Sequence, residues 1–312
     1  MPPSPDAEVD LLVHVMTTPD LICKDFFRLL MTELRQNADR ADGRTVLITG
    51  ANSGVGLATA VHLARLGFHS VGSIRSPAKG ACVAEAASSA GVTVETVILD
   101  VTDAELCRSV IDRLRPWALV NNAGYSGIGA IEDVTDEEVR RLLETMVVAP
   151  MRLARLALPH MRAAGQGRIV NVSSIYGLTT TPFSGWYQAS KHALEAASDA
   201  LRVEVAHDGI KVVLIEPGGV KTHIWDEMEE ELAGRADSSY ETGYRRIRTL
   251  LAPFMPLMVG PEAVAKVIGE ALTAGSPRAR YRVGLDAQVV AATQCLVPTW
   301  VKDRISRILT GL

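Results

Sequence analysis

From residue 44 onward, the chain alternates short runs rich in β-branched residues with longer stretches of helical apolar spacing. Seven runs occur in the order TVLITG, SVGSIR, TVETVILD, ALVNNAG, RIVNVSS, KVVLIEPGG and RYRVG, the last of which would form an edge strand. The intervening stretches are long enough for the crossover helices that parallel strands require. The alternation therefore predicts an α/β fold: a doubly wound parallel sheet of about seven strands with helices on both faces.

The rest of the chain extends this core at both ends. Residues 1–43 precede the first strand, and their apolar residues between 21 and 34 recur at mostly helical spacing, which predicts an N-terminal helical extension. We expect this helix to dock on the main domain or on a second subunit, because its mixed acidic and basic polar face does not favour a membrane surface. Residues 44–285 would form the catalytic domain, with a substrate lid at about 219–279, and residues 286–312 a C-terminal helical tail.

Composition narrows the classes of function. The 312 residues are 47% hydrophobic and 22% charged with a net charge of -4, so a full core is expected and a nucleic-acid partner is not. The four cysteines lack the spacing of a zinc site and the density of a disulfide scaffold, so no metal is expected. Because no signal peptide or membrane span is recognisable, we expect a cytoplasmic protein without membrane association.

A glycine-rich turn, TGANSGVG at 49–56, lies between the first strand and the following helix. Its glycines permit a tight turn, and the positive end of the helix suits a pyrophosphate. Because strand, turn and helix agree, this segment predicts a dinucleotide site. Its candidate binding residues are Gly50, Asn52, Ser53, Gly54, Val55 and Gly56.

Arg75 indicates which dinucleotide is bound. An acid that binds the ribose 2′-hydroxyl is expected at the end of the second strand, but Ile74 and Arg75 stand there. A guanidinium binds a 2′-phosphate, so NADP(H) is predicted over NAD(H), unless Arg75 is only a solvated surface residue. Asp100, after the third strand, either binds the adenine amine or caps the next helix.

Tyr187 and Lys191 are candidate catalytic residues. Their spacing places them one turn apart on one face of a helix, where a nearby ammonium would lower the pKa of the tyrosine toward working pH. Ser174 ends the fifth run, so its hydroxyl would lie at the carboxyl edge of the sheet and bond the substrate oxygen. Turn formation or helix capping is the structural alternative for this serine.

In combination these motifs resemble the short-chain dehydrogenase/reductase family, and they follow the family's order over about residues 44–285. The matching pieces are TGANSGVG, Asp100 with Val101, Asn121-Asn122-Ala123-Gly124, Ser174, Tyr187 with Lys191, and Pro217-Gly218 with Val220 and Thr222. The resemblance implies a Rossmann-like fold and an NADP-dependent oxidoreductase. It also implies that the NNAG segment supports the sheet beside the cofactor, that Tyr187 and Lys191 lie at the nicotinamide ribose, and that Val220 and Thr222 contact the carboxamide.

One position departs from the family. Met146 stands where the family often has an asparagine that holds a water linking the lysine to solvent. A thioether is at best a weak acceptor and does not replace the amide. This departure leaves two alternatives open beside redox chemistry: a non-redox isomerase, dehydratase or cyclase on the same scaffold, and a non-catalytic dinucleotide-binding sensor.

Apolar and aromatic residues of the lid and nearby loops predict a fairly large apolar substrate, unless they only pack the lid or a dimer contact. They are Tyr125, Ile128, Phe183, Trp186, Trp225, Met228, Tyr240, Tyr244 and the run 253–258. The late YRVG segment resembles the 17β-hydroxysteroid and retinol dehydrogenase branch, which suggests steroid-, retinoid- or polyketide-like ketones and a carbonyl reduction. The family resemblance also implies a homodimer or homotetramer, paired through long helices at about 136–162 and 186–207.

Overall fold

The computed structural model describes residues 43–235, 237–294 and 296–312. The predicted N-terminal helix lies outside the described residues. The predicted runs form one parallel sheet with the order β3-β2-β1-β4-β5-β6-β7, which confirms the Rossmann-like doubly wound fold. The strands are β1 Thr45–Ile48, β2 His69–Ile74, β3 Glu95–Ile98, β4 Ala118–Asn121, β5 Gly167–Val172, β6 Ile210–Pro217 and β7 Arg280–Val283.

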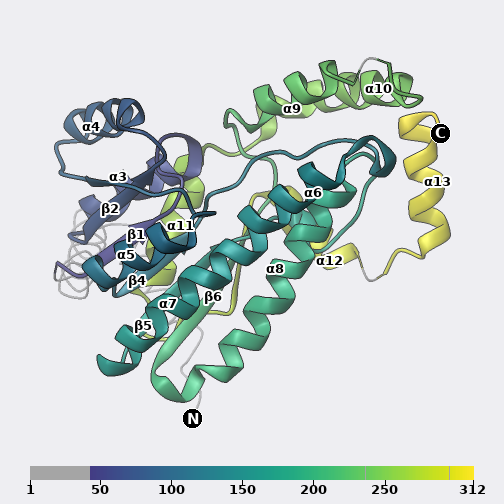
Figure 1. Cartoon of the computed structure of the whole chain (residues 1–312). Helices are drawn as coiled ribbons and strands as arrows, with labels where there is room; N and C mark the ends of the chain where they lie inside the picture. Colours follow the sequence, from purple (N-terminus) through teal and green to yellow (C-terminus); the bar gives the residue numbers. More distant parts are fainter. Residues whose placement is uncertain (1–42, 236, 295) are drawn as a thin grey trace, which may run out of the picture. The chain divides into compact units, whose positions relative to one another are not determined.

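Helices cover both faces of the sheet (Figure 1). On one face α3 (Gly54–Arg65) packs against α11 (Pro261–Thr273), and α4 (Gly80–Ser89) contacts α3. On the other face α5 (Ala104–Leu114) packs against α7 (Ala149–Ala163), and α8 (Gly185–Glu204) lies on β6.

The strands are apolar because both faces are covered. Val46, Leu47 and Ile48 of β1 are all fully buried, as are Leu119 and Val120 of β4. A parallel sheet between two helical layers has no solvent side, so its strands do not alternate apolar with polar residues. Each fully buried large aliphatic side chain contributes about 1.5–3 kcal/mol relative to an exposed one.

The strand order reverses between β1 and β4, since β1 connects outward to β2 and the chain then returns to the other side of β1. Ligands of open α/β sheets bind outside the carboxyl ends of the strands at such a reversal. The glycine-rich turn follows β1 and the NNAG segment follows β4, so both lie at this point.

A π-helical segment interrupts the long helix that the sequence predicted at 136–162. The capped helix α6 (Asp136–Leu143) leads into η3 (Glu144–Val148), which continues directly into α7. Wide π turns within α-helices occur frequently at functional sites. Met146 lies in this segment and is buried.

The segment after β6 carries its own helices. They are α9 (Ile224–Ala233), α10 (Glu241–Leu251) and the short η6 (Ala252–Leu257), followed by α11. Beyond β7, α12 (Leu285–Thr293) and α13 (Thr299–Thr310) end the chain, and α13 packs against α10 (Figure 1). Among the described residues no helix combines the length and the apolar character needed to span a membrane.

Candidate active site

The glycine-rich turn is shaped by the absence of side chains. Gly50 and Gly54 adopt positive φ of 68° and 53°, a region that favours glycine. A Cβ on Gly56 would lie 2.2 Å from the Gly50 carbonyl oxygen. Helix α3 can therefore begin directly against the turn, and its positive end faces the sheet edge.

The NNAG segment holds this turn in place through Thr49. The only sequence signal for this role of Thr49 is its position in the glycine-rich motif. The backbone amides of Asn122 and Ala123 donate to Thr49 Oγ1 at 2.9 and 3.0 Å. Asn122 Nδ2 donates to the Thr49 carbonyl at 2.9 Å. From the other side, the Gly50 amide donates to Ser73 Oγ at 3.2 Å. Strands β1, β2 and β4 therefore fix the turn together.

The start of α3 suits an anion. Ser53 is the N-cap residue, and within the described residues its side chain makes no capping hydrogen bond. The first amides of a helix have no intrahelical acceptor, so an external acceptor such as a phosphate satisfies them. Thr222 reaches the same turn, since its Cγ2 lies 3.2 Å from the Cβ position of Gly54. Asn52 and Val55 belong to the turn and to α3 respectively, as predicted.

The loop after β6 is fixed by a residue that the sequence did not single out. Asp286 of α12 accepts a hydrogen bond from the Gly219 amide at 2.7 Å and leaves no room for a side chain on Gly218. Val220 pairs with Val259 in a parallel bridge. These contacts hold the Pro217-Gly218 turn, with Val220 and Thr222, at the carboxyl edge of the sheet.

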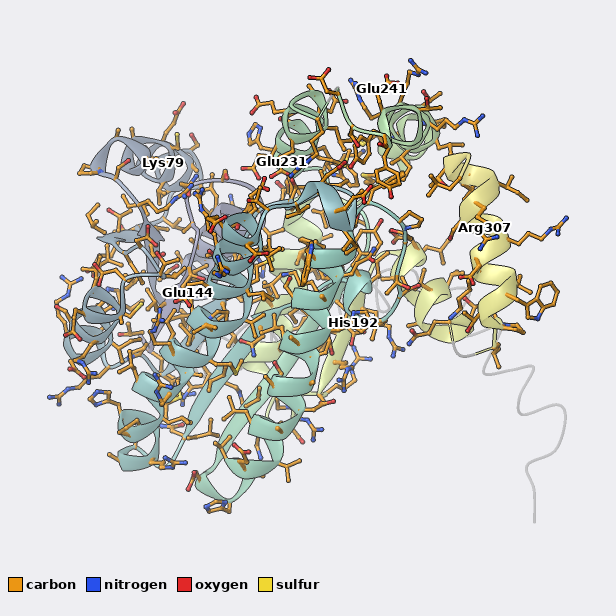
Figure 2. The ribbon with its side chains drawn as sticks, turned by 45° about the vertical axis from the view of Figure 1, so that its right-hand side comes forward. Lys79, Glu144, His192, Glu231, Glu241 and Arg307 are labelled. Atoms are coloured by element: carbon orange, nitrogen blue, oxygen red, sulfur yellow. The ribbon has the colours of Figure 1, made fainter. Side chains whose placement is uncertain are left out.

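Arg75 is exposed directly after β2. Burial and Glu231 raise the pKa of Glu227 on α9, whereas the charges of Arg75 and Lys79 act to lower it. Two cations therefore lie near the end of β2, and the sequence reasoning missed Lys79. Figure 2 labels Lys79 and, on α9, Glu231.

Asp100 does not cap the following helix. Its Oδ1 accepts hydrogen bonds from the Thr102 hydroxyl at 2.7 Å and the Thr102 amide at 2.9 Å, and these bonds, with a contribution from Arg75, lower its pKa. The cap of α5 is Asp103, so the capping alternative for Asp100 is wrong. Asp100 and the buried Val101 lie beside the end of β3, where the sequence predicted them.

Ser174, Tyr187 and Lys191 come together at the carboxyl edge of β5. The Ser174 hydroxyl bonds the Tyr187 side chain, and Ser174 Oγ also accepts a hydrogen bond from the Tyr176 amide at 3.2 Å. Lys191 Nζ lies 5.6 Å from the centre of the Tyr187 ring and donates to the Val172 carbonyl at 3.0 Å. Ser174 therefore both caps a short helix and contacts the tyrosine.

Burial dominates the pKa values of this group. It raises the pKa of Tyr187, with the hydrogen bond to Ser174 acting in the opposite direction, and it lowers the pKa of Lys191 to about 8. The sequence expectation of a lowered tyrosine pKa is therefore wrong for the chain by itself. Removing a phenolate from water is costly, and in the chain by itself this cost outweighs the hydrogen bond from Ser174.

Beside Lys191 lies a partly buried ionic network that was not anticipated from the sequence. Glu195, one turn further along α8, pairs with Arg280 at 3.0 Å, and Arg280 also pairs with Glu216 at 2.9 Å and Asp199 at 2.6 Å. Burial raises the pKa of Glu195, while its charge acts to raise the pKa of Lys191. These residues are far apart in the sequence, so no local pattern indicates their contact.

Met146 lies beside this group, as the departure from the family pattern predicted. Its Sδ lies 3.3 Å from Ser190 Oγ, and its methyl group lies 2.9 Å from the Cβ position of Gly124. The Ser190 hydroxyl also donates to the Tyr187 carbonyl at 2.6 Å. A thioether therefore fills the space between the NNAG segment and α8.

Several predicted pocket residues instead pack α9 and α10 against the loops that follow β4 and β5. Ile128, Phe183, Met228 and Tyr244 are buried against one another, with Trp225 and Tyr240 packed on this cluster. For these residues the packing alternative is correct. Glu231 of α9 adds polar contacts, accepting from the Ser126 hydroxyl at 2.5 Å and the Ile128 amide at 2.8 Å. Tyr125 and Trp186 remain partly exposed.

Comparison with known proteins identifies relatives along most of the chain. It is 35% identical to the uncharacterized oxidoreductase YbbO of Escherichia coli K12, over 84% of this chain and 93% of that protein. It is 32% identical to the NADPH-dependent 3-dehydrocapnine reductase of Ornithobacterium rhinotracheale, over 84% and 95%. Human retinol dehydrogenase 5 is 29% identical over 85% and 88%, in agreement with the predicted branch.

Solved structures agree with this relationship. A short-chain dehydrogenase from Streptomyces avermitilis superposes with a TM-score of 0.69 at 30% identity, covering 85% of this chain and 95% of that one. A metagenomic short-chain oxidoreductase in complex with NADP gives 0.61 at 25% identity, covering 79% and 100%. The family model described as short chain dehydrogenase matches residues 44–233. The chain therefore belongs to the short-chain dehydrogenase family of oxidoreductases, which bind a nicotinamide dinucleotide.

Proposed function

We propose that this protein is an NADPH-dependent reductase that converts the carbonyl of a fairly large apolar substrate into a secondary alcohol. The observation that carries the proposal is the contact of Ser174 with Tyr187 above the buried Lys191, at the sheet edge beside the glycine-rich turn. In this proposal the three residues are catalytic.

The residues present fit a dinucleotide. The positive φ of Gly50 and Gly54 and the space beside Gly56 allow close backbone approach, and the start of α3 has amides available for the pyrophosphate. Asp100 and Val101 would lie at the adenine, and Asn122, Ala123 and Gly124 along the ribose and sheet edge. Pro217, Gly218, Val220 and Thr222 would border the nicotinamide. Bound NADPH supplies the hydride.

The chain's own groups handle the proton and the developing charge. The Tyr187 hydroxyl donates its proton to the substrate oxygen as the carbonyl carbon is reduced. The Ser174 hydroxyl donates a hydrogen bond to the same oxygen and stabilises its negative charge. Lys191 stabilises the resulting phenolate by its positive charge, and its hydrogen bond to the Val172 carbonyl orients the ammonium.

Arg75 supports the preference for NADPH. It is an exposed guanidinium where an acid would otherwise bind the 2′-hydroxyl, and Lys79 brings a second positive charge nearby. Charge-assisted bonds to a phosphate are strong for arginine in particular. The relative named as an NADPH-dependent reductase agrees with this choice.

The names of two relatives support different parts of this proposal. The 3-dehydrocapnine reductase supports the reductive direction, and the retinol dehydrogenase supports the substrate class. We therefore propose a lipid-like ketone, within the steroid-, retinoid- and polyketide-like range that the sequence suggests.

A calorimetric titration tests the cofactor assignment. We expect NADPH to bind at least tenfold more tightly than NADH, a difference of about 1.4 kcal/mol. The Arg75→Ala variant should lose most of this preference by weakening NADPH alone, whereas the exposed Arg65→Ala variant should match the wild type. Equal binding of the two cofactors would contradict the role of Arg75, and binding of neither would overturn the reductase proposal.

A further inference from the structure

The C-terminal helices carry a concentration of exposed apolar side chains. Of the 13 large hydrophobic side chains that are exposed in the described residues, eight lie within residues 285–312. They are Leu285, Val289, Leu296, Trp300, Ile305, Ile308, Leu309 and Leu312. Single exposed apolar residues are ordinary, but a concentration of this kind on one segment marks an interaction surface.

Helix α13 is buried at Thr310, near its C-terminal end, and leaves most of its apolar side chains exposed. Thr310 is only 2% exposed, and the following Gly311 fits against Arg246 of α10 with no space for a side chain. By contrast Trp300 is 70% and Ile308 is 68% exposed. At about 100° per residue, Ile305 and Ile308 lie on the side of the helix opposite Thr310. The docking of α13 on α10 therefore leaves Ile305 and Ile308 exposed.

Positive charge flanks this apolar face. Helix α13 contains Lys302, Arg304 and Arg307 but only one acid, Asp303, whereas the whole chain has a net charge of -4. Within the described part of the chain, no ion pair involves Arg304 or Arg307. Figure 2 shows α13 beside α10, with Arg307 labelled on it.

From these features we propose that α13 lies on the surface of a membrane containing anionic lipids, with its apolar face in the lipid and its arginines at the headgroups. An interfacial helix has this combination of an apolar face, flanking cations and an aromatic residue, and it needs no spanning length. Anionic headgroups complement Arg304 and Arg307. The sequence expectation of no membrane association rested on missing spans and on the N-terminal segment, and it did not consider this face.

A second copy of the chain fits this face less well. In a symmetric contact the same patch meets itself, so two helices that each carry three cations and only one acid would be brought together. Helix α13 lies next to α10, so the proposed membrane contact is beside the predicted lid. An apolar substrate would enter there, and this substrate route alone rests on the proposed function.

Vesicle cosedimentation of the full chain tests the proposal without substrate or cofactor, so its result is independent of the reductase assignment. We expect the protein to bind vesicles of equal parts phosphatidylglycerol and phosphatidylcholine, and to bind phosphatidylcholine alone at least tenfold more weakly. The double variant Trp300→Ser/Ile308→Ser should lose at least tenfold in affinity for the mixed vesicles. Ile131→Ser, which alters an apolar residue that is 59% exposed outside the C-terminal helices, should bind like the wild type.

Two further measurements complete the test: vesicle binding by a charge variant, and the mass in solution, which reports self-association, of the apolar double variant. Arg304→Gln/Arg307→Gln should remove the preference for the mixed vesicles, and added salt should weaken wild-type binding in the same way. Circular dichroism and NADPH titration of each variant check that the fold is retained. Wild-type protein that stays unbound to both vesicle types would overturn the proposal. So would a loss of self-association in the apolar double variant without any vesicle binding, which would instead identify a second copy as the occupant.

Discussion

Lys191 and Glu195 lie one turn apart on α8, so the charge of a buried carboxylate acts on the ammonium beside Tyr187. Burial lowers the pKa of Lys191 to about 8, and Glu195 opposes that change. The ammonium form stabilises the phenolate, so activity should be present below this pKa and fall as pH rises through it.

Replacing Glu195 by glutamine removes the opposing charge. The pKa of Lys191 should then fall below about 8, and the alkaline limb of kcat/KM should move to lower pH. Asp199→Asn is the matched control, because Asp199 also pairs with Arg280 but does not contribute to the pKa of Lys191. A Glu195→Gln profile that superposes on the wild type would contradict this coupling.

Tyr187→Phe tests the proposed proton donor. Removing the hydroxyl should reduce kcat by about 10²–10⁴-fold, the usual contribution of a general acid, while NADPH affinity changes little. Single-turnover measurements and calorimetry separate the two effects. Tyr176→Phe is the control, since its ring lies edge-on to Tyr187 at 6.1 Å and it has no proposed proton role. Unchanged turnover in the Tyr187→Phe variant would instead favour the sensor alternative.

The sequence predicted the individual motif residues better than their electrostatics. Tyr187 and Lys191 were identified by their spacing on one helix, and Arg75 by the absence of an acid beside it. The rise in the Tyr187 pKa was not predicted, because it depends on how much solvent the folded chain removes. Glu195 and Arg280 were missed because their pairing joins a helix to a distant edge strand.

Among the secondary-structure elements, the glycine-rich turn tolerates the least change. Gly56→Ala would bring a methyl group to 2.2 Å from the Gly50 carbonyl oxygen, so α3 would have to shift away from β1. We expect a loss of about 1–3 kcal/mol in the free energy of unfolding, typical of overpacking, and loss of NADPH binding. Denaturant unfolding and calorimetry measure both. Gly275→Ala, with no atom within 4 Å of its Cβ position, should leave both unchanged.

Helix α10, in the predicted lid, is held by a buried tyrosine hydroxyl. Tyr244 of α10 accepts a hydrogen bond from the Ala130 amide at 2.7 Å and donates to Asp133. Tyr244→Phe leaves the Ala130 amide without its acceptor, while Asp133 keeps its hydrogen bond from Ser238, so the attachment of α10 should weaken by about 1–3 kcal/mol. Hydrogen exchange should then be faster in α10 and unchanged in α8. The partly exposed Tyr240→Phe is the control, and equal protection of α10 in both variants would show that the Tyr244 hydroxyl does not hold the lid.

The strands and crossover helices were predictable because both follow local periodicity, and buried runs such as that of β1 leave little ambiguity. The lid aromatics were not resolved in this way. Phe183 and Tyr244 are suited equally to a pocket and to packing, and only the fold brings them to a ring distance of 4.7 Å.

For the whole molecule, assembly remains a prediction. We expect a homodimer or homotetramer paired through α7 and α8, the two long helices of one face. Sedimentation velocity should give a mass two or four times that of the chain. Val203→Glu, which introduces a charge at a 66% exposed position of α8, should shift the distribution toward monomer. The control is Leu250→Glu, an exposed position on α10, and a wild-type chain that sediments as a monomer would contradict the expectation.

The π-helical segment at Glu144–Val148 has a consequence for alignment and for single-residue deletions. A wide turn holds one more residue than a regular α-helical turn, and one residue corresponds to about 100° of rotation. Because the wide turn absorbs this extra residue, deleting one residue here would restore an ordinary α-helix and keep the buried side of α7, including Leu153 and Met161, against the sheet. A homologue with a regular helix at this point should align with a one-residue gap. The residue of the homologue that aligns with Met146 then depends on where in the segment that gap is placed.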